Sequence, residues 1–345
     1  MASMYYDGTK LLSLKDINGC EPDLYLCTTN RTAGKTTYFS RLLVNRFVKR
    51  KEKFGLIYRF KYELDDIPNK FFKDINSLFF PDLEMKSQVR AKGIYHELFL
   101  NNIACGYALS LNCADTLKKY SHIFSDISSM FMDEFQSETG HYCPNEVEKF
   151  ISLHTSVARG QGKMYRRVPV YMCGNPVTLL NPYYVALGIS SKLQKSTHFL
   201  RGDGFVLEQG YSANAEKAQR ESAFNRAFSE NSYTAYTAEG VYLNDNDAFV
   251  EKIIGIGKYI ATIKYNGKSY AIREFQKQGI IYCDNRADES FPFRLAVTTD
   301  DHNVNYVMLQ NNLLFIDRMR YFFERGCFRF KDLSCKNAII SMLSF

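Results

Sequence analysis

The stretch with the clearest chemical potential is residues 24–37, with the sequence LYLCTTNRTAGKTT. A short apolar segment leads through a polar loop into Gly34-Lys35-Thr36, and a helical pattern follows. This order is typical of a P-loop, in which backbone N–H groups cradle phosphates, a lysine reaches the β- and γ-phosphates, and a hydroxyl group binds Mg²⁺. The N-terminus of the following helix directs free N–H groups and its positive dipole end at the same anion. The stretch therefore predicts a nucleotide site with Lys35 on the phosphates and Thr36 on the metal.

One position departs from the usual P-loop pattern. Thr29 stands where the first glycine normally lies, and because threonine accepts a positive φ less readily than glycine, we expect the loop to turn differently. A chance Gly-Lys-Thr is the alternative, and the order of strand, loop and helix favours the nucleotide site. The predicted nucleotide-binding residues are Thr29, Asn30, Arg31, Thr32, Ala33, Gly34, Lys35, Thr36 and Thr37, with Asn175 from a later strand.

A pair of carboxylates forms the second chemical feature. Residues 127–132 are mostly apolar and run into Asp133 and Glu134, as at the Walker B position of P-loop enzymes, where the aspartate holds the Mg²⁺ shell. An adjacent glutamate can orient and deprotonate the attacking water. A strand that simply ends in an acidic turn is the alternative. Asn175 ends the next predicted strand, 168–173, where its amide could sense the γ-phosphate or the attacking water.

Positive charges gather behind a predicted helix over residues 145–159. Gly160 and Gly162 break that helix, and Arg159, Lys163, Arg166 and Arg167 flank them. Such a loop is either solvated, which is usual for charged residues, or presents a cation to the γ-phosphate of a neighbouring subunit.

Length and composition indicate a globular protein of two domains. The chain has 345 residues, which exceeds the size at which one core usually stops growing. Its net charge of +7 permits a polyanionic partner without requiring one. Nine cysteines without any C-x-x-C pair indicate reduced thiols, and no apolar run reaches membrane-spanning length, so we expect no membrane association.

The pattern changes toward β-structure after about residue 240. Segments 259–265 and 268–274 flank Asn266-Gly267, which favours a type I′ hairpin turn. Periodic apolar residues predict helices over 215–228 and 307–325, and earlier in the chain over 64–78.

Several stretches resemble the double-stranded-DNA packaging ATPases of small, protein-primed tailed phages, the phi-29-like group, which are related to large terminases. The resemblance runs through nearly the whole chain. The stretches that carry it are residues 31–35, 58–64, 132–135, 144–147, 175–176, 181–183 and 298–301.

The resemblance implies an α/β P-loop domain of the additional-strand, catalytic-glutamate (ASCE) type over residues 1–200. A helical linker over 201–240 and an RNase H-like, vestigial nuclease domain over 241–345 would follow. It implies a homopentameric ring, acting in the host cytoplasm and transiently on the portal vertex of a procapsid, that uses ATP and Mg²⁺ to drive double-stranded DNA inward. The phage portal (connector) and a structural packaging RNA would be its partners.

Individual roles are carried over by position. Lys35 and Thr36 would serve the phosphates and Mg²⁺, Asp133 would be the Mg²⁺ carboxylate, and Glu134 the catalytic base. Arg159 would act in trans on the next subunit's nucleotide, with Lys163, Arg166 or Arg167 able to share that role. Lys61 would serve communication between subunits.

Three further questions stay open at the level of sequence. DNA contacts could come from the basic helix end at 46–53 or from the hairpin near Asn101-Asn102. A terminase-like motor with an active metal-dependent nuclease is the alternative function, with Asp284, Asp288, Asp300 and Asp301 as available acids. The C-terminal domain could instead serve only as a docking module for RNA or portal protein.

Overall fold

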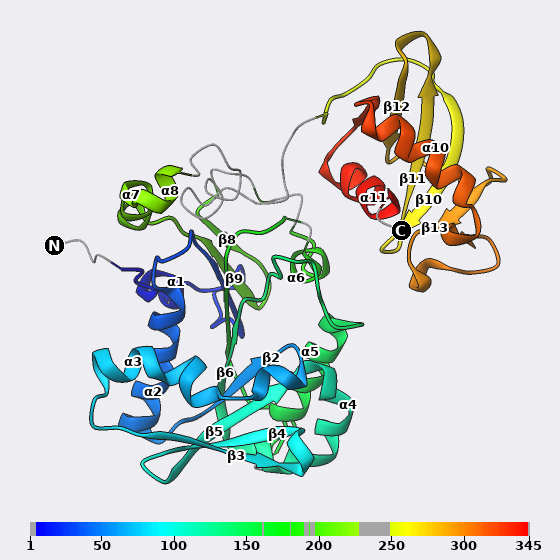
Figure 1. Cartoon of the computed structure of the whole chain (residues 1–345). Helices are drawn as coiled ribbons and strands as arrows, with labels where there is room; N and C mark the ends of the chain where they lie inside the picture. Colours follow the sequence, from blue (N-terminus) through cyan, green and yellow to red (C-terminus); the bar gives the residue numbers. More distant parts are fainter. Residues whose placement is uncertain are drawn as a thin grey trace. The chain divides into compact units, whose positions relative to one another are not determined.

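The chain of this computed structural model divides into two units, Met1–Asn244 and Asp245–Phe345, each with its own sheet. Figure 1 shows the elements of both units. The structure describes residues 5–160, 162–179, 181–189, 193, 197–227 and 249–343.

The first unit is built on a mixed sheet with the order β3-β4-β5-β2-β6-β7-β1-β9-β8. The β7 strand pairs in parallel with both β1 and β6, so it separates the strand before the P-loop from the strand before the paired carboxylates. An inserted strand at this point is the feature that the ASCE expectation requires. The strands are β1 (Leu24–Thr28), β2 (Lys53–Tyr58), β3 (Met85–Arg90), β4 (Tyr95–Leu100), β5 (Ile103–Ser110), β6 (Ile127–Asp133), β7 (Val170–Gly174), β8 (Phe199–Arg201) and β9 (Phe205–Gln209).

Helices cover both faces of this sheet (Figure 1). Successive side chains of a strand point to opposite faces, so Tyr25 of β1 joins the core under α2 while Leu26 joins the core under α5. Burial on both faces explains why the central strands read as continuous apolar runs. The helices are α1 (Thr9–Ser13), α2 (Lys35–Arg50), α3 (Lys73–Phe79), α4 (Ala114–Leu117), α5 (Glu146–Val157), α6 (Pro182–Ala186), α7 (Ala213–Glu221) and α8 (Ala223–Ala227).

The second unit contains a sheet with the order β14-β13-β10-β11-β12-β15. The strands β10, β11 and β12 form an antiparallel meander, and β13 pairs in parallel with β10. This mixed α/β arrangement agrees with the RNase H-like expectation. The elements are β10 (Lys258–Tyr265), β11 (Lys268–Phe275), β12 (Ile280–Asp284), β13 (Arg294–Ala296), β14 (Val307–Met308), α10 (Leu313–Glu324), β15 (Phe328–Phe330) and α11 (Leu333–Leu343).

Both predicted hairpins are confirmed. Asn266 and Gly267 have φ of 50° and 73°, which the type I′ turn between β10 and β11 requires. Asn101 and Asn102 likewise have positive φ between β4 and β5.

The predicted linker over residues 201–240 begins too early. The β9 strand lies inside those bounds, yet it pairs in parallel with β1 and belongs to the main sheet. Its buried Phe205, Val206 and Leu207 form too short an apolar run to identify a strand without its partner. The α7 and α8 helices follow it, and residues 228–240 lie outside the described part of the chain.

Two predicted helices are shorter than expected. The segment from Lys61 to Phe79 contains a 3₁₀ turn and a π-helical turn at Pro68–Phe72 before α3, because a proline interrupts regular α-helical bonding. Val307–Met308 is an edge strand, and α10 starts only at Leu313.

Candidate active site

The P-loop joins the end of β1 to the start of α2. Its left-handed residues are Thr32, with φ of 62°, and Gly34, with φ of 93°, whereas Thr29 is not among the residues with positive φ. The hydroxyl of the buried Thr29 donates to the carbonyl of Asn30. The loop therefore accommodates threonine at the usual first glycine without strain, because it turns in its second half.

The lysine of the loop faces the neighbouring strand end. Lys35 Nζ donates to Asn175 Oδ1 at 2.8 Å, and Asn175 Nδ2 donates to Glu138 at 3.2 Å. Glu138 is also ion-paired with Arg31. The structure thus brings together residues from the P-loop, from the end of β7, and from the loop after β6.

A cavity of about 430 Å³ adjoins the first turn of α2, and Thr36, Asp133 and Glu134 all line it. Hydroxyl and carboxylate oxygens are the hard ligands that Mg²⁺ prefers. Asp133 Oδ1 also accepts hydrogen bonds from the backbone N–H of Glu134 and from the thiol of Cys173, both at 2.9 Å, which fixes the orientation of its carboxylate. The donor set therefore fits a Mg²⁺ held by Thr36 and Asp133.

Glu134 has an unusual backbone and an altered acidity. Its φ of 54° is left-handed, which is uncommon for a residue with a side chain. The carboxylate is accessible to solvent yet lies in a recess, so the surrounding protein reduces its hydration. This partial burial, followed by the negative charges of Asp133 and Glu138, raises the pKa of Glu134, and Arg31 and Lys35 oppose the shift. A raised pKa brings a carboxylate closer to the range useful for a general base.

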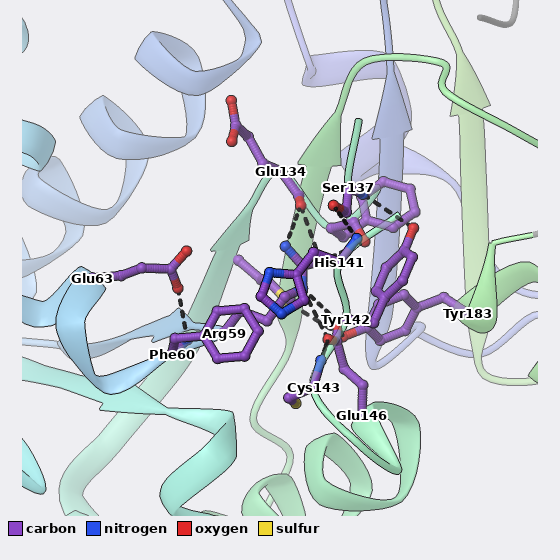
Figure 2. Close-up of polar contacts among 12 residues, drawn as sticks. Arg59, Phe60, Glu63, Glu134, Ser137, His141, Tyr142, Cys143, Glu146 and Tyr183 are labelled. Atoms are coloured by element: carbon purple, nitrogen blue, oxygen red, sulfur yellow. Dashed lines mark hydrogen bonds and ion pairs between the residues drawn. The ribbon is translucent and has the colours of Figure 1, made fainter. Parts of the chain in front are cut away.

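Below Glu134 lies a buried ion pair between Arg59, which follows β2, and Glu146, which begins α5 (Figure 2). Arg59 Nε donates to both carboxylate oxygens of Glu146, at 2.9 and 2.8 Å. Its two terminal nitrogens donate to the carbonyl of Glu134, each at 3.2 Å, and one of them also reaches the carbonyl of Phe135 at 2.9 Å. Figure 2 shows the Glu134 side chain directed away from Arg59, so the contact is to the backbone.

The segment after β9 forms hydrogen bonds with the P-loop. Asn30 and Ser212 exchange two hydrogen bonds of 3.0 Å between the asparagine side chain and the serine backbone. Gln219 of α7 donates to the carbonyl of Arg31 at 3.0 Å and to the hydroxyl of Thr32 at 2.9 Å. These hydrogen bonds connect the P-loop to α7, which precedes the second unit in the sequence.

Two predicted residues lie away from this assembly. Lys61 is exposed and donates to the carbonyl of Lys92 at 2.9 Å. Arg159 is exposed after the end of α5, and the next residue, Gly160, packs against Ser125, just before β6 begins. Since β6 has seven residues and a strand rises roughly 3.3 Å per residue, Arg159 is about 20 Å from the carboxyl end that bears Glu134.

The neighbouring arginines of this loop have structural partners. Arg166 donates to the carbonyls of Ile127 and Val157, and Arg167 donates to the carbonyl of Pro22. For Arg159, by contrast, no hydrogen-bond or ion-pair partner occurs within the described ranges.

Reasoning from sequence missed the residues that support the site rather than bind the nucleotide. The residues without a predicted role are Arg59, Glu138, Glu146, Tyr183 and Gln219. A signal for part of this set was present, because Glu146 and Tyr183 lie in the short stretches that carry the family resemblance, 144–147 and 181–183.

Fold and site together define a P-loop ATPase-type domain of the additional-strand class, followed by a smaller α/β unit. The chain belongs to the family described as Podovirus DNA encapsidation protein (Gp16), whose model matches residues 1–344. It is 26% identical over 339 residues to the DNA packaging protein of Bacillus phage phi29, covering 97% of this chain and 96% of that protein.

Two solved structures share the fold. A chain of the bacteriophage Phi-29 viral genome packaging motor assembly superposes with a TM-score of 0.66 at 24% identity, covering 99% of this chain and 98% of that one. The N-terminal domain of the DNA packaging ATPase from bacteriophage phi29 superposes with a TM-score of 0.50 at 26% identity, covering 61% of this chain and 98% of that one. No helix among the described residues is long and apolar enough to cross a membrane.

Proposed function

We propose that this protein hydrolyses ATP to drive viral double-stranded DNA into a procapsid. The observation that carries the proposal is the convergence of Lys35, Asn175 and the Asp133–Glu134 pair at the carboxyl ends of adjacent strands β1, β7 and β6. Family membership supports DNA as the substrate that is moved.

Hydrolysis would depend mainly on positioning and electrostatics. The P-loop amides and Lys35 would bind the phosphates of ATP, and Glu134 would align water with the γ-phosphorus and accept its proton. Mg²⁺ held by Thr36 and Asp133 would neutralise charge on the phosphates. Asn175 would orient Lys35 and the water, because it accepts a hydrogen bond from that lysine.

An arginine from a neighbouring subunit would complete the site. Arg159 lies near the start of β6, about 20 Å from the carboxyl end that bears Glu134, which is too far to reach the nucleotide of its own subunit. It is also the arginine of its loop without a hydrogen-bond or ion-pair partner in the described part of the chain. Both facts support a trans role for Arg159 over Arg166 and Arg167, while Lys163, also exposed, could share that role. Hydrolysis would then require a ring, which we expect to be a pentamer, with Lys61 on the exposed surface as a further candidate for subunit contact.

DNA would be held through its phosphates and without base readout. Sequence-independent, salt-sensitive binding follows when a few lysines and arginines neutralise the backbone. Within the basic helix end, Arg46 and Lys53 are engaged with Tyr171 and Asp126. Arg50 is also ion-paired, with Glu52 at 3.6 Å, so the exposed Lys49 is the better candidate, with the β4–β5 hairpin as a second one.

The C-terminal unit would dock the motor on the portal or its RNA rather than cut DNA. Two-metal cleavage needs clustered acids. Asp284 is ion-paired with Arg273 at 2.9 Å, and Asp301 caps the β10–β11 turn. Across the described residues, no three His, Cys, Asp or Glu side chains are grouped to hold a metal. A plasmid-nicking assay with Mg²⁺ or Mn²⁺ tests this, and metal-dependent nicking would favour the terminase-like alternative.

The first experiment compares ATP hydrolysis by the wild type and by Glu134→Gln, with and without long duplex DNA. Hydrolysis stimulated by DNA and lost in the variant is the expected result. Hydrolysis that persists in Glu134→Gln would contradict the assigned base, and hydrolysis indifferent to DNA would contradict coupling by this protein alone.

A further inference from the structure

The fork of Arg59 grips two consecutive backbone carbonyls, those of Glu134 and Phe135. Arg59 is 8% exposed and Glu146 is 3% exposed, so this is a charged pair inside the protein. Burying two charges is costly and is compensated only when geometry is good and the remaining donors and acceptors are satisfied. The hydrogen bonds of this pair end on one backbone turn, at Glu134 and Phe135, which indicates that the pair serves that turn.

The partners of Glu146 complete the arrangement. Its carboxylate accepts a hydrogen bond from the hydroxyl of Tyr183 at 2.8 Å and from the backbone N–H of Cys143 at 2.9 Å, besides the two from Arg59. The ring of Tyr142 lies against the guanidinium, with 5.0 Å between the guanidinium carbon and the ring centroid. Arg59 is thus fixed from β2, α5 and α6 together, and little freedom is left for its fork.

Arg59 binds the backbone of Glu134, the residue of this turn with an unfavourable conformation. Glu134 adopts a left-handed φ of 54°, and a residue with a side chain keeps such a conformation only when its surroundings enforce it. The enforcing contacts on the carbonyl side come from Arg59. On the amide side, the N–H of Glu134 donates to Asp133. A change of φ at Glu134 would swing its carboxylate away from the cavity that it shares with Thr36.

We propose that Arg59, locked by Glu146, is a positioning residue that sets the backbone turn at Glu134 and thereby aims its carboxylate at the attacking water. The inference rests on the proposed hydrolysis and goes further by assigning a residue that touches neither nucleotide nor metal. Its consequence is that the Arg59–Glu146 pair governs the rate of the chemical step and leaves nucleotide affinity nearly unchanged.

The test uses Arg59→Lys in the full chain, which keeps the charge but loses the fork that spans two carbonyls. Misplacement of a catalytic group by about 1 Å costs on the order of 10²-fold in rate, so we expect kcat to fall by roughly that factor. Affinity for a fluorescent ATP analogue should change less than about threefold, since the P-loop is untouched.

Two further variants separate positioning from folding. Tyr183→Phe removes one hydrogen bond to Glu146 and keeps the ion pair, so it should show the same pattern with a kcat loss of up to about tenfold. Arg90→Lys alters the exposed Arg90–Glu97 pair of the same domain and should leave kcat and nucleotide affinity at wild-type values. A merely structural role of Arg59 would lower the fraction of protein that binds nucleotide, and the kcat of the fraction that does bind would stay at the wild-type value.

Amide hydrogen exchange over residues 134–137 supplies a readout that does not need catalysis. Faster exchange there in Arg59→Lys, with the P-loop unchanged, supports the inference. Exchange at the wild-type rate in Arg59→Lys overturns the inference. A wild-type kcat in Arg59→Lys also overturns it, provided that Glu134→Gln abolishes hydrolysis. If the wild type has no Glu134-dependent hydrolysis, the proposed function fails and takes the catalytic part of the inference with it, while exchange still reports whether Arg59 holds the turn.

Discussion

Lys35 donates a hydrogen bond to the side-chain oxygen of Asn175 at 2.8 Å, although 140 positions separate the two residues. The contact exists because the inserted strand β7 pairs with β1 and ends beside the P-loop. Asn175 therefore lies beside the P-loop lysine that we propose binds the phosphates of ATP.

Asn175→Ala should lower kcat for ATP by roughly 10²-fold, the scale of losing one preorganised polar contact in a transition state. Steady-state kinetics and nucleotide binding separate this effect from weakened affinity. Asn69→Ala, which removes an exposed asparagine of the same unit, serves as the control and should retain wild-type kcat. Equal kcat in both variants would show that the contact with Lys35 has no catalytic role.

The pKa of Glu134 gives a prediction for pH dependence. A general base works only when ionised, so a raised pKa means that activity is lost as pH falls through a value above that of an ordinary glutamate. Glu138→Gln removes one of the negative charges that raise this pKa. The acid limb of the kcat–pH profile should then move to lower pH. A limb that stays in place, or moves upward, would remove Glu138 from the electrostatics of the base.

Local patterns were enough to select the residues of the candidate site, because these residues lie at strand ends within contiguous motifs. The loop, the paired acids and Asn175 each follow an apolar run, and strand order alone then brings them together. The supporting contacts could not be predicted this way. Arg59 and Glu146 are 87 positions apart, and Gln219 reaches Thr32 from 187 positions away. Such contacts depend on tertiary packing, which no periodicity records.

The fold likewise contains elements that local sequence predicts and elements that depend on tertiary packing. The two hairpins follow from Asn-Asn and Asn-Gly, whose turns are local. The β9 strand is not predicted from the sequence because a strand of five residues carries little local signal, and its pairing with β1 and β8 depends on tertiary contacts. The π-helical turn at Pro68–Phe72 contributes Lys70 and Phe71 to the wall of the cavity beside Asp133, and proline alone indicates only where a helix is disturbed.

Gln219 should influence nucleotide affinity through the P-loop. It donates hydrogen bonds to Arg31 and to Thr32, where the loop turns left-handed. Because a hydrogen bond contributes about 0.5–1.5 kcal/mol, Gln219→Ala should raise the Kd for ATP by roughly threefold to tenfold. Lys217→Ala on the same helix removes only an exposed pair with Glu221 and should leave the Kd unchanged. Identical titration curves for the two variants would refute a link between α7 and the P-loop.

Adjacent aspartates of the C-terminal unit should differ sharply in their effect on stability. The carboxylate of Asp301 accepts the backbone N–H groups of Asn266 and Gly267, each at 2.8 Å, and the hydroxyl of Thr298 at 2.6 Å, whereas Asp300 is exposed. Asp301→Ala should lower the free energy of unfolding of this unit by about 2–3 kcal/mol.

Asp300→Ala is the matched control and should change that free energy by no more than about 0.5 kcal/mol. The labelling rate of the buried Cys283 in urea, followed by mass spectrometry, reports unfolding of this unit separately from the first. Similar labelling of the two variants would mean that Asp301 does not stabilise the turn.

The trans role of Arg159 is tested by mixing two inactive proteins. Arg159→Ala lacks the donated arginine, and Lys35→Ala lacks a working phosphate site, so each should be inactive alone. In mixed rings, an Arg159→Ala subunit can receive an intact arginine from a Lys35→Ala neighbour, and random assembly makes roughly a quarter of interfaces productive. We therefore expect partial recovery of ATP hydrolysis that peaks near equal amounts. A mixture of Lys35→Ala with Glu134→Gln is the matched control, because both changes damage the site within one subunit and no interface can be intact. Absence of recovery at every ratio, in rings shown to have mixed, would return Arg159 to the status of a solvated loop residue.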